Sequence, residues 1–108
     1  MEMAGTALDT DVNQRTKDEL PKLYHVIILN DDEHTFEYVI EMLQTVFKIP
    51  YATAFAHTVE ADSTGSSIVL TTNLEEAEQK RDQVHAYGPD WRMPNSRGSV
   101  AALVELAS

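Results

Sequence analysis

The 108-residue sequence contains no cysteine, only four glycines and only four prolines. Without thiols, the chain can form neither a disulfide framework nor a thiolate metal site, and this composition fits a reducing compartment. A chain of this length can build one modest hydrophobic core but not two, so we expect a single domain.

Positive charge is also scarce. The sequence has 8 Lys and Arg residues against 18 Asp and Glu residues, which gives a formal net charge of -10. Such a chain repels phosphate backbones and anionic lipid surfaces, so we expect neither nucleic acid nor a membrane as a partner. A cationic group, or a protein surface rich in Lys and Arg, is the natural electrostatic complement.

Long apolar runs are missing as well. No window approaches the length of a membrane span, and residues 1–22 lack a basic start followed by an apolar run, so we expect no signal peptide, no anchor and a cytoplasmic protein. Residues 1–22 are also poor in large apolar groups. This composition predicts a flexible arm ahead of a folded domain over residues 23–108.

The first half of this domain predicts one strand and two helices. Residues 23–29, LYHVIIL, are rich in β-branched and aromatic residues and precede a turn, which is typical of a central strand. From Thr35, a suitable N-cap, apolar residues recur at helical spacing, and the inner face is Phe36, Val39, Ile40, Leu43, Val46 and Phe47. Pro50 then opens a second helix, whose inner face we expect to be Tyr51, Ala54, Phe55, Thr58 and Val59.

The second half predicts strand, helix and strand. Residues 62–65 have turn chemistry, residues 67–72 read as a strand, and Thr72 or Asn73 caps a third helix over residues 74–87. We expect that helix to face inward with Leu74, Ala77, the stem of Arg81 and Val84. After a loop over residues 89–98, residues 99–106 alternate as a strand, with Val100, Ala102 and Val104 on one face. The order β-α-α-β-α-β predicts an α+β fold, a small three-stranded antiparallel sheet with three helices packed on it.

The junction between the first strand and the first helix is unusually polar. Residues 30–34, NDDEH, place an amide, three carboxylates and an imidazole in succession. A metal-dependent enzyme could use Asp31, Asp32 and His34, but neither the three fixed ligands of a catalytic zinc site nor the alternating pattern of a calcium loop is present. Acid/base catalysis has no nucleophile with a recognisable partner, so we expect neither an enzyme nor a cofactor.

A turn and a helix cap also leave this junction with a surplus of acceptors. One or two of these side chains suffice for a turn and a cap, whereas several acceptors lie together here. Acceptors clustered in this way can hold an ammonium group, and an apolar neighbour such as Phe36 can receive a side chain beside it.

The sequence resembles the ClpS adaptor family of bacterial protein degradation. The resemblance rests on VIILNDDEHTFEYVIEMLQTVF, then the Gly65 turn, then IVLTTNLEEAEQKRDQV and a closing strand. It implies a non-enzymatic adaptor that binds proteins with an N-terminal Leu, Phe, Tyr or Trp and delivers them to a ClpA- or ClpC-type AAA+ unfoldase acting with the ClpP peptidase. The α-amine would be held by the Asn-Asp-Asp junction, and the bulky side chain would fill an apolar pocket.

The resemblance also assigns residues. It implies that the N-terminal residue is bound by Asn30, Asp31, Asp32, His34, Phe36, Thr58, Ala61, Asp62 and Val100. It implies that Glu75 and Lys80 contact the unfoldase, which also engages the arm. Two positions depart from the family pattern, because Asp62 stands where a histidine is usual and Phe36 where a smaller or more flexible residue is usual. These changes suggest shifted selectivity, or else a regulatory domain that docks on the unfoldase without binding such N-termini.

Overall fold

A computed structural model of the protein describes residues 21–107. In chain order it contains β1 (Tyr24–Leu29), α2 (Phe36–Phe47), α3 (Tyr51–Thr64), β2 (Ser66–Thr72), α4 (Leu74–His85) and β3 (Ala102–Leu106). The predicted arm over residues 1–22 lies outside the described residues except for Pro21 and Lys22. That part of the domain division therefore stays a prediction.

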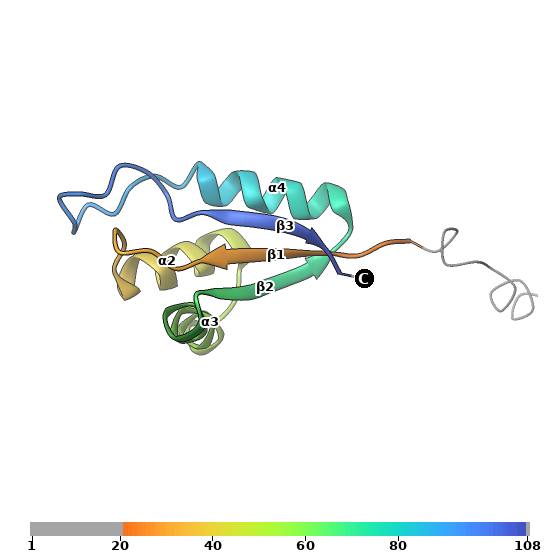
Figure 1. The fold of residues 1–108 in the computed structure, drawn as a ribbon, viewed down its shortest axis with the longest axis horizontal. Helices are drawn as coiled ribbons and strands as arrows, with labels where there is room; N and C mark the ends of the chain where they lie inside the picture. Colours follow the sequence, from red (N-terminus) through yellow and green to blue (C-terminus); the bar gives the residue numbers. More distant parts are fainter. Residues whose placement is uncertain (1–20, 108) are drawn as a thin grey trace, which may run out of the picture.

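The sheet has the strand order β2-β1-β3, with both neighbours antiparallel to the central β1 (Figure 1). This arrangement confirms the predicted α+β fold with three helices and a three-stranded antiparallel sheet. Because successive side chains of a strand point to opposite faces, Val26 and Ile28 lie on the same face of β1, and they are 0% and 1% exposed. The central strand therefore supplies the middle of the core.

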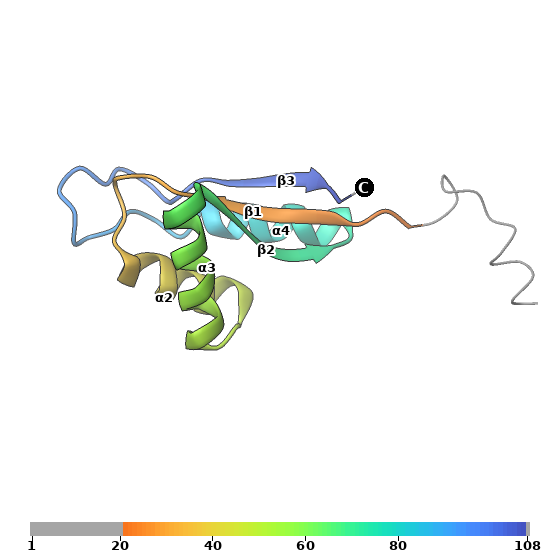
Figure 2. The ribbon, with the colours of Figure 1, turned by 60° about the horizontal axis from the view of Figure 1, so that its bottom comes forward.

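The helices cover one face of the sheet. Helix α4 runs along the strands, whereas α2 and α3 lie together at the end of the sheet where β1 ends (Figures 1 and 2). The opposite face carries no described helix, and Ile68 and Leu103 on it remain 46% and 41% exposed. No helix among residues 21–107 is both long and apolar enough to cross a membrane.

Helix α2 begins and ends as local chemistry predicts. The hydroxyl oxygen of Thr35 accepts a hydrogen bond from the amide of Tyr38, and Lys48 ends the helix in the left-handed conformation. The predicted inner face of α2 was too narrow, because Tyr38 and Met42 are also buried. Phe36, which we expected on that face, is 41% exposed. The reason is that α2 packs against both α3 and α4, so its buried surface is wider than a single stripe.

Helix α3 differs more from the sequence prediction. Its buried side chains are the small Ala54, Thr58 and Ala61, whereas Tyr51, Phe55 and Val59, which we expected to face inward, are 59%, 45% and 38% exposed. Small residues let α3 approach its neighbours closely, and the large side chains then project outward. The helix also continues to Thr64, where we expected a turn, and ends at Gly65, whose positive φ of 98° suits glycine.

Helix α4 is capped by Asn73, one of the two predicted alternatives. The side-chain oxygen of Asn73 accepts from the amide of Glu76 at 2.8 Å. Ala77 and Val84 are buried as expected, but Leu74 is 41% exposed because it lies in the first turn, at the end of the helix. The helix ends at His85, two residues before the predicted end.

The last strand is shorter than predicted. It starts at Ala102 instead of Ser99, because the Ser99 hydroxyl is used to hold the preceding loop: it accepts from the amide of Gly88 at 2.7 Å and lies 3.1 Å from the carbonyl oxygen of His85. Val100 therefore lies in the loop, although it is still buried at 2% exposure. The loop between α4 and β3 reaches the start of α2.

Asp90 makes that contact. Its side chain is fully buried, and its Oδ2 accepts from the amide and the hydroxyl of Thr35 at 2.7 and 2.8 Å, across 55 positions of the sequence. Its Oδ1 accepts from the amide and guanidinium of Arg92 at 3.0 and 3.2 Å. Burial alone would raise the pKa of Asp90, but these hydrogen bonds outweigh it and lower the pKa from 3.8 to about 2.

Removing the Asp90 carboxylate should weaken the whole domain. We expect Asp90→Ala to lower the free energy of unfolding by about 3 kcal/mol, the upper end of the cost of leaving a buried donor without an acceptor. Chemical denaturation measures the change. As a matched control, Asp82→Ala removes a carboxylate that is 69% exposed, and it should alter the same free energy by about 0.5 kcal/mol or less. Equal changes in the free energy of unfolding for the two variants would contradict the role of Asp90 as a buried acceptor that stabilises the fold.

The lowered pKa of Asp90 also predicts how stability depends on pH. Because the folded-state pKa lies below the ordinary value of 3.8, the carboxylate contributes its full stabilisation above pH 3.8 and loses it as the pH falls toward 2. Denaturation of the wild type and of Asp90→Asn between pH 6 and pH 2 measures this. The gap between their free energies of unfolding should narrow on acidification, and a constant gap would be inconsistent with the hydrogen bonds described.

Candidate binding pocket

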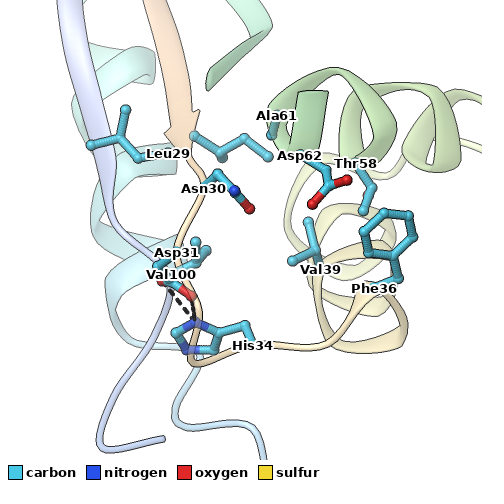
Figure 3. Close-up of a pocket in the computed structure, with 11 residues that line it drawn as sticks. Leu29, Asn30, Asp31, His34, Phe36, Val39, Thr58, Ala61, Asp62 and Val100 are labelled. Atoms are coloured by element: carbon cyan, nitrogen blue, oxygen red, sulfur yellow. Dashed lines mark hydrogen bonds and ion pairs between the residues drawn. The ribbon is translucent and has the colours of Figure 1, made fainter. Parts of the chain in front are cut away.

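An open pocket lies where the end of β1, the start of α2 and the end of α3 meet (Figure 3). Its empty space, counted out to the open mouth, is about 400 Å³. It is lined by Ile28, Leu29, Asn30, Asp31, His34, Phe36, Val39, Thr58, Ala61, Asp62 and Val100.

Part of the pocket wall is apolar. Ile28 and Val100 are almost fully buried, and Ala61 is 4% exposed. Thr58 adds no free polar group, because its hydroxyl donates to the carbonyl of Ala54 within the same helix at 2.8 Å. An aliphatic or aromatic side chain that packs against these residues would therefore leave water without burying an unpaired donor or acceptor of this part of the wall.

Two polar side chains reach toward the pocket space from opposite sides. Asn30 projects from the end of β1 and Asp62 from the last turn of α3 (Figure 3). The backbone amide of Asn30 donates to the carbonyl of Gly65 at 2.9 Å, which ties the strand end to the helix end. Neither side chain has a hydrogen-bond partner among residues 21–107, so both can accept a hydrogen bond from a ligand.

The acceptors of Asp31 are already in use. Its Oδ1 accepts from the amide of Glu33 at 2.8 Å, and both carboxylate oxygens lie 2.8 Å from Nδ1 of His34. His34 lies against the ring of Tyr38, with the ring centroids 4.5 Å apart. Burial raises the pKa of Tyr38, whose hydroxyl donates to the carbonyl of Gly88 at 2.7 Å. This wall of the pocket is therefore a fixed polar network.

The structure brings together most of the residues assigned from the resemblance. Eight of the nine line the pocket, whereas Asp32, which follows Asp31 directly, is exposed and is not among the lining residues. The pocket adds Ile28, Leu29 and Val39, which the sequence analysis did not name as site residues. Val39 could have been found, because it lies on the same face of α2 as Phe36.

The pocket offers little to a metal or to catalysis. The described residues contain no group of three or more His, Asp or Glu side chains that could hold a metal ion. Outside the pocket, Ser67 lies 2.8 Å from Nδ1 of His57, but its hydroxyl donates to Glu60 at 2.5 Å and Ser67 is 2% exposed. Because Ser67 is buried, a substrate has no access to its hydroxyl, unlike that of an activated nucleophile.

Glu75 and Lys80, the residues assigned to the unfoldase, lie on α4 away from the pocket. Glu75 is exposed in the first turn of the helix. The ammonium of Lys80 instead donates to the carbonyl of Val46 at 2.9 Å, at the end of α2. Since α2 has no basic residue in its last turn, Lys80 supplies the cation that favours a helix C-terminus.

Comparison with known proteins gives a consistent set of matches. A family model described as "ATP-dependent Clp protease adaptor protein ClpS" matches residues 19–94. The ClpS adapter of Clostridium acetobutylicum is 37% identical over 97 residues, which cover 88% of this chain and 96% of the relative. That of Nautilia profundicola is 42% identical over 66 residues, covering 61% of this chain and 68% of the relative.

A solved structure agrees with these matches. Agrobacterium tumefaciens ClpS2 bound to L-phenylalaninamide resembles this fold with a TM-score of 0.70 and 29% sequence identity, covering 81% of this chain and 99% of that chain. The family match runs from before β1 to beyond α4, so it contains the strand end and both helices that form the pocket. The chain therefore belongs to the ClpS family, whose members are adaptors of the ATP-dependent Clp protease and not enzymes.

Proposed function

We propose that the pocket binds the N-terminal residue of proteins that begin with a bulky hydrophobic amino acid, and that this adaptor delivers them to a Clp AAA+ unfoldase. The observation that carries the proposal is the pairing of two unused acceptors, Asn30 and Asp62, with an apolar pocket wall. The acceptors suit a free α-ammonium group, and the wall suits the first side chain. An internal peptide segment lacks the ammonium group.

The ligand of the Agrobacterium ClpS2 structure supports this proposal. L-phenylalaninamide combines a free α-amine, an aromatic side chain and an amidated carboxyl group, so it has the chemistry of an N-terminal phenylalanine at the start of a polypeptide. In the present pocket, the α-amine would meet the free acceptors and the aromatic side chain would meet the apolar wall. The amidated carboxyl group would lie at the open mouth. An N-terminal Leu, Phe, Tyr or Trp is accordingly the proposed substrate feature.

The unusual Asp62 strengthens the amine side of the site. A carboxylate facing an ammonium group makes a hydrogen bond in which both partners are charged, whereas the neutral histidine usual in the family accepts the bond without a negative charge of its own. Phe36 lies at the rim and is 41% exposed, and the pocket beside it is open. We therefore propose that Phe36 borders the bound side chain without closing the site.

The proposed delivery partner is a ClpA- or ClpC-type unfoldase that acts with ClpP. Glu75 supports this part, because it is exposed on α4, on a surface separate from the pocket. A docking surface apart from the pocket would let the adaptor hold substrate and unfoldase together. The alternative role, docking without substrate binding, is the outcome if no free-amine peptide binds.

The first functional prediction concerns Asn30. We expect Asn30→Ala to weaken the binding of a Phe-initiated peptide by roughly 10- to 100-fold, because a hydrogen bond to a charged group contributes about 1.5–3 kcal/mol. Fluorescence anisotropy with labelled peptides starting with Leu, Phe, Trp or Ala measures this. Glu37→Gln removes an exposed carboxylate from the first turn of α2, outside the pocket, and serves as the matched control.

Two results of that titration would contradict the proposed function. One is an N-acetylated Phe peptide that binds the wild type as tightly as the free-amine peptide, since acetylation removes the ammonium group. The other is an Asn30→Ala variant that retains full affinity while remaining folded. Binding that is weakened equally by Glu37→Gln would point to long-range charge instead of direct contact.

The second functional prediction concerns Glu75. Reversing its charge with Glu75→Lys should weaken association with the N-terminal domain of the unfoldase while leaving peptide affinity unchanged, because the two surfaces are separate. Glu105→Lys makes the same charge change on β3, away from α4, and should leave the association intact. Surface plasmon resonance with the immobilised unfoldase domain measures both. Full retention by Glu75→Lys would exclude Glu75 from the docking surface.

A further inference from the structure

Both ring nitrogens of His34 face hydrogen-bond acceptors. Nδ1 lies 2.8 Å from each carboxylate oxygen of Asp31, and Nε2 lies 2.7 Å from the carbonyl oxygen of Gly98. The carbonyl oxygen of Gly98 has no proton to give, so Nε2 must donate. Nδ1 must donate as well, because an unprotonated nitrogen this close to a carboxylate would repel it.

A neutral imidazole carries one N–H and can satisfy only one of these contacts. If Asp31 and His34 share a proton, it resides on the ring and not on the carboxyl group, because an imidazole is a stronger base than a carboxylate. The arrangement in which every donor meets an acceptor therefore has both nitrogens of His34 protonated and Asp31 ionised. It is a short ion pair in the pocket wall.

The surroundings of the ring favour this charged form. The His34 side chain is 3% exposed, and a buried cation is tolerated only when it is paired. Asp31 pairs with it from the segment after β1, the face of the Tyr38 ring lies on it from α2, and the Gly98 carbonyl faces it from the loop after α4. Other charged groups nearby are Asp90, which binds Thr35 and is paired with Arg92, and Asp62 across the pocket.

We propose that His34 is a positioning residue that acts as a doubly protonated cation, fixing Asp31 and the loop before β3 in the wall of the pocket. Gly98 precedes Val100 by two residues, so the bond from Nε2 holds the segment that places Val100 against the ligand space. The bond from Nδ1 holds the Asp31 carboxylate against the imidazole and neutralises it. His34 thereby shapes the site without reaching the substrate through its own donors.

This arrangement sets the charge of the site, and here the inference rests on the proposed function. With Asp31 balanced by His34, the Asp62 carboxylate is the one pocket charge without a partner among the described residues. One unbalanced carboxylate matches one α-ammonium group. If His34 were neutral, the pocket would carry two negative charges for one ligand cation, and Asp31 would be free to turn toward the amine.

Nitrogen-detected NMR of uniformly ¹⁵N-labelled protein at pH 7 tests the protonation directly. We expect the His34 ring to show two protonated nitrogens and two slowly exchanging N–H protons, and His34→Gln identifies these signals by their loss. A single protonated nitrogen would overturn the inference. The measurement needs no peptide, so it stands even if the proposed function fails.

The binding consequence is read from peptide affinity at pH 7. We expect His34→Gln to bind a Phe-initiated peptide several-fold more weakly than the wild type, because a single uncharged amide nitrogen can neither balance Asp31 nor reach both Asp31 and the carbonyl of Gly98. Glu37→Gln, outside the pocket, should bind as tightly as the wild type. Equal affinities of His34→Gln and the wild type would overturn the positioning role, while peptide binding would still support the proposed function.

A double substitution guards against a merely structural effect. The double variant with Asp31→Asn and His34→Gln replaces the ion pair by two neutral amides. It therefore leaves no unpaired charge at these two positions. We expect the double variant to be more stable than Asp31→Asn alone, which leaves the buried His34 cation without its counter-ion. Additive losses of stability would show that the two side chains are not paired, and would overturn the inference.

Discussion

The buried carboxylate of Asp90 is the contact on which the geometry of the pocket depends. It binds the amide and the hydroxyl of Thr35, the residue that caps α2, and it also organises its own loop through Arg92. One ionised group thus fixes where α2 begins and where the loop after α4 lies. Since both segments contribute lining residues, Phe36 and Val100, the shape of the pocket depends on a carboxylate that does not itself line it.

The pocket contains two kinds of surface that can recognise a ligand, an apolar wall and unused polar acceptors. Its apolar wall responds to the bulk of a side chain, a property that many peptide segments share, and an apolar pocket by itself distinguishes similar side chains only weakly. Unused polar acceptors are more selective, because a ligand that cannot pair with them leaves them desolvated without compensation. The combination suits the proposed role of an adaptor that selects a chain end without altering it chemically.

Small residues of α3 make this pocket possible. Ala54 and Ala61 are almost fully buried, and with Thr58 they let α3 lie close to α2 and β2. The large side chains Phe55 and Tyr51 then stack on the outer surface, with their ring centroids 6.3 Å apart. A helix whose inner face carried those rings would stand farther from α2, and the space between the two helices and β1 would have a different shape.

The sequence by itself determined the order of the elements, the cap at Thr35 and the concentration of acceptors at Asn30 and Asp31. These features depend on neighbours a few positions apart, where strand and helix geometry fix which groups meet. It could not determine that Asp62 faces Asn30, since the periodicity of α3 was dominated by large residues that turned out to be exposed, and only the family resemblance had pointed to that position. Nor could it show that His34 meets Gly98 or that Asp32 lies outside the pocket. Both features depend on segments that are far apart in the chain. Only the packing of the helices on the sheet brings these segments together.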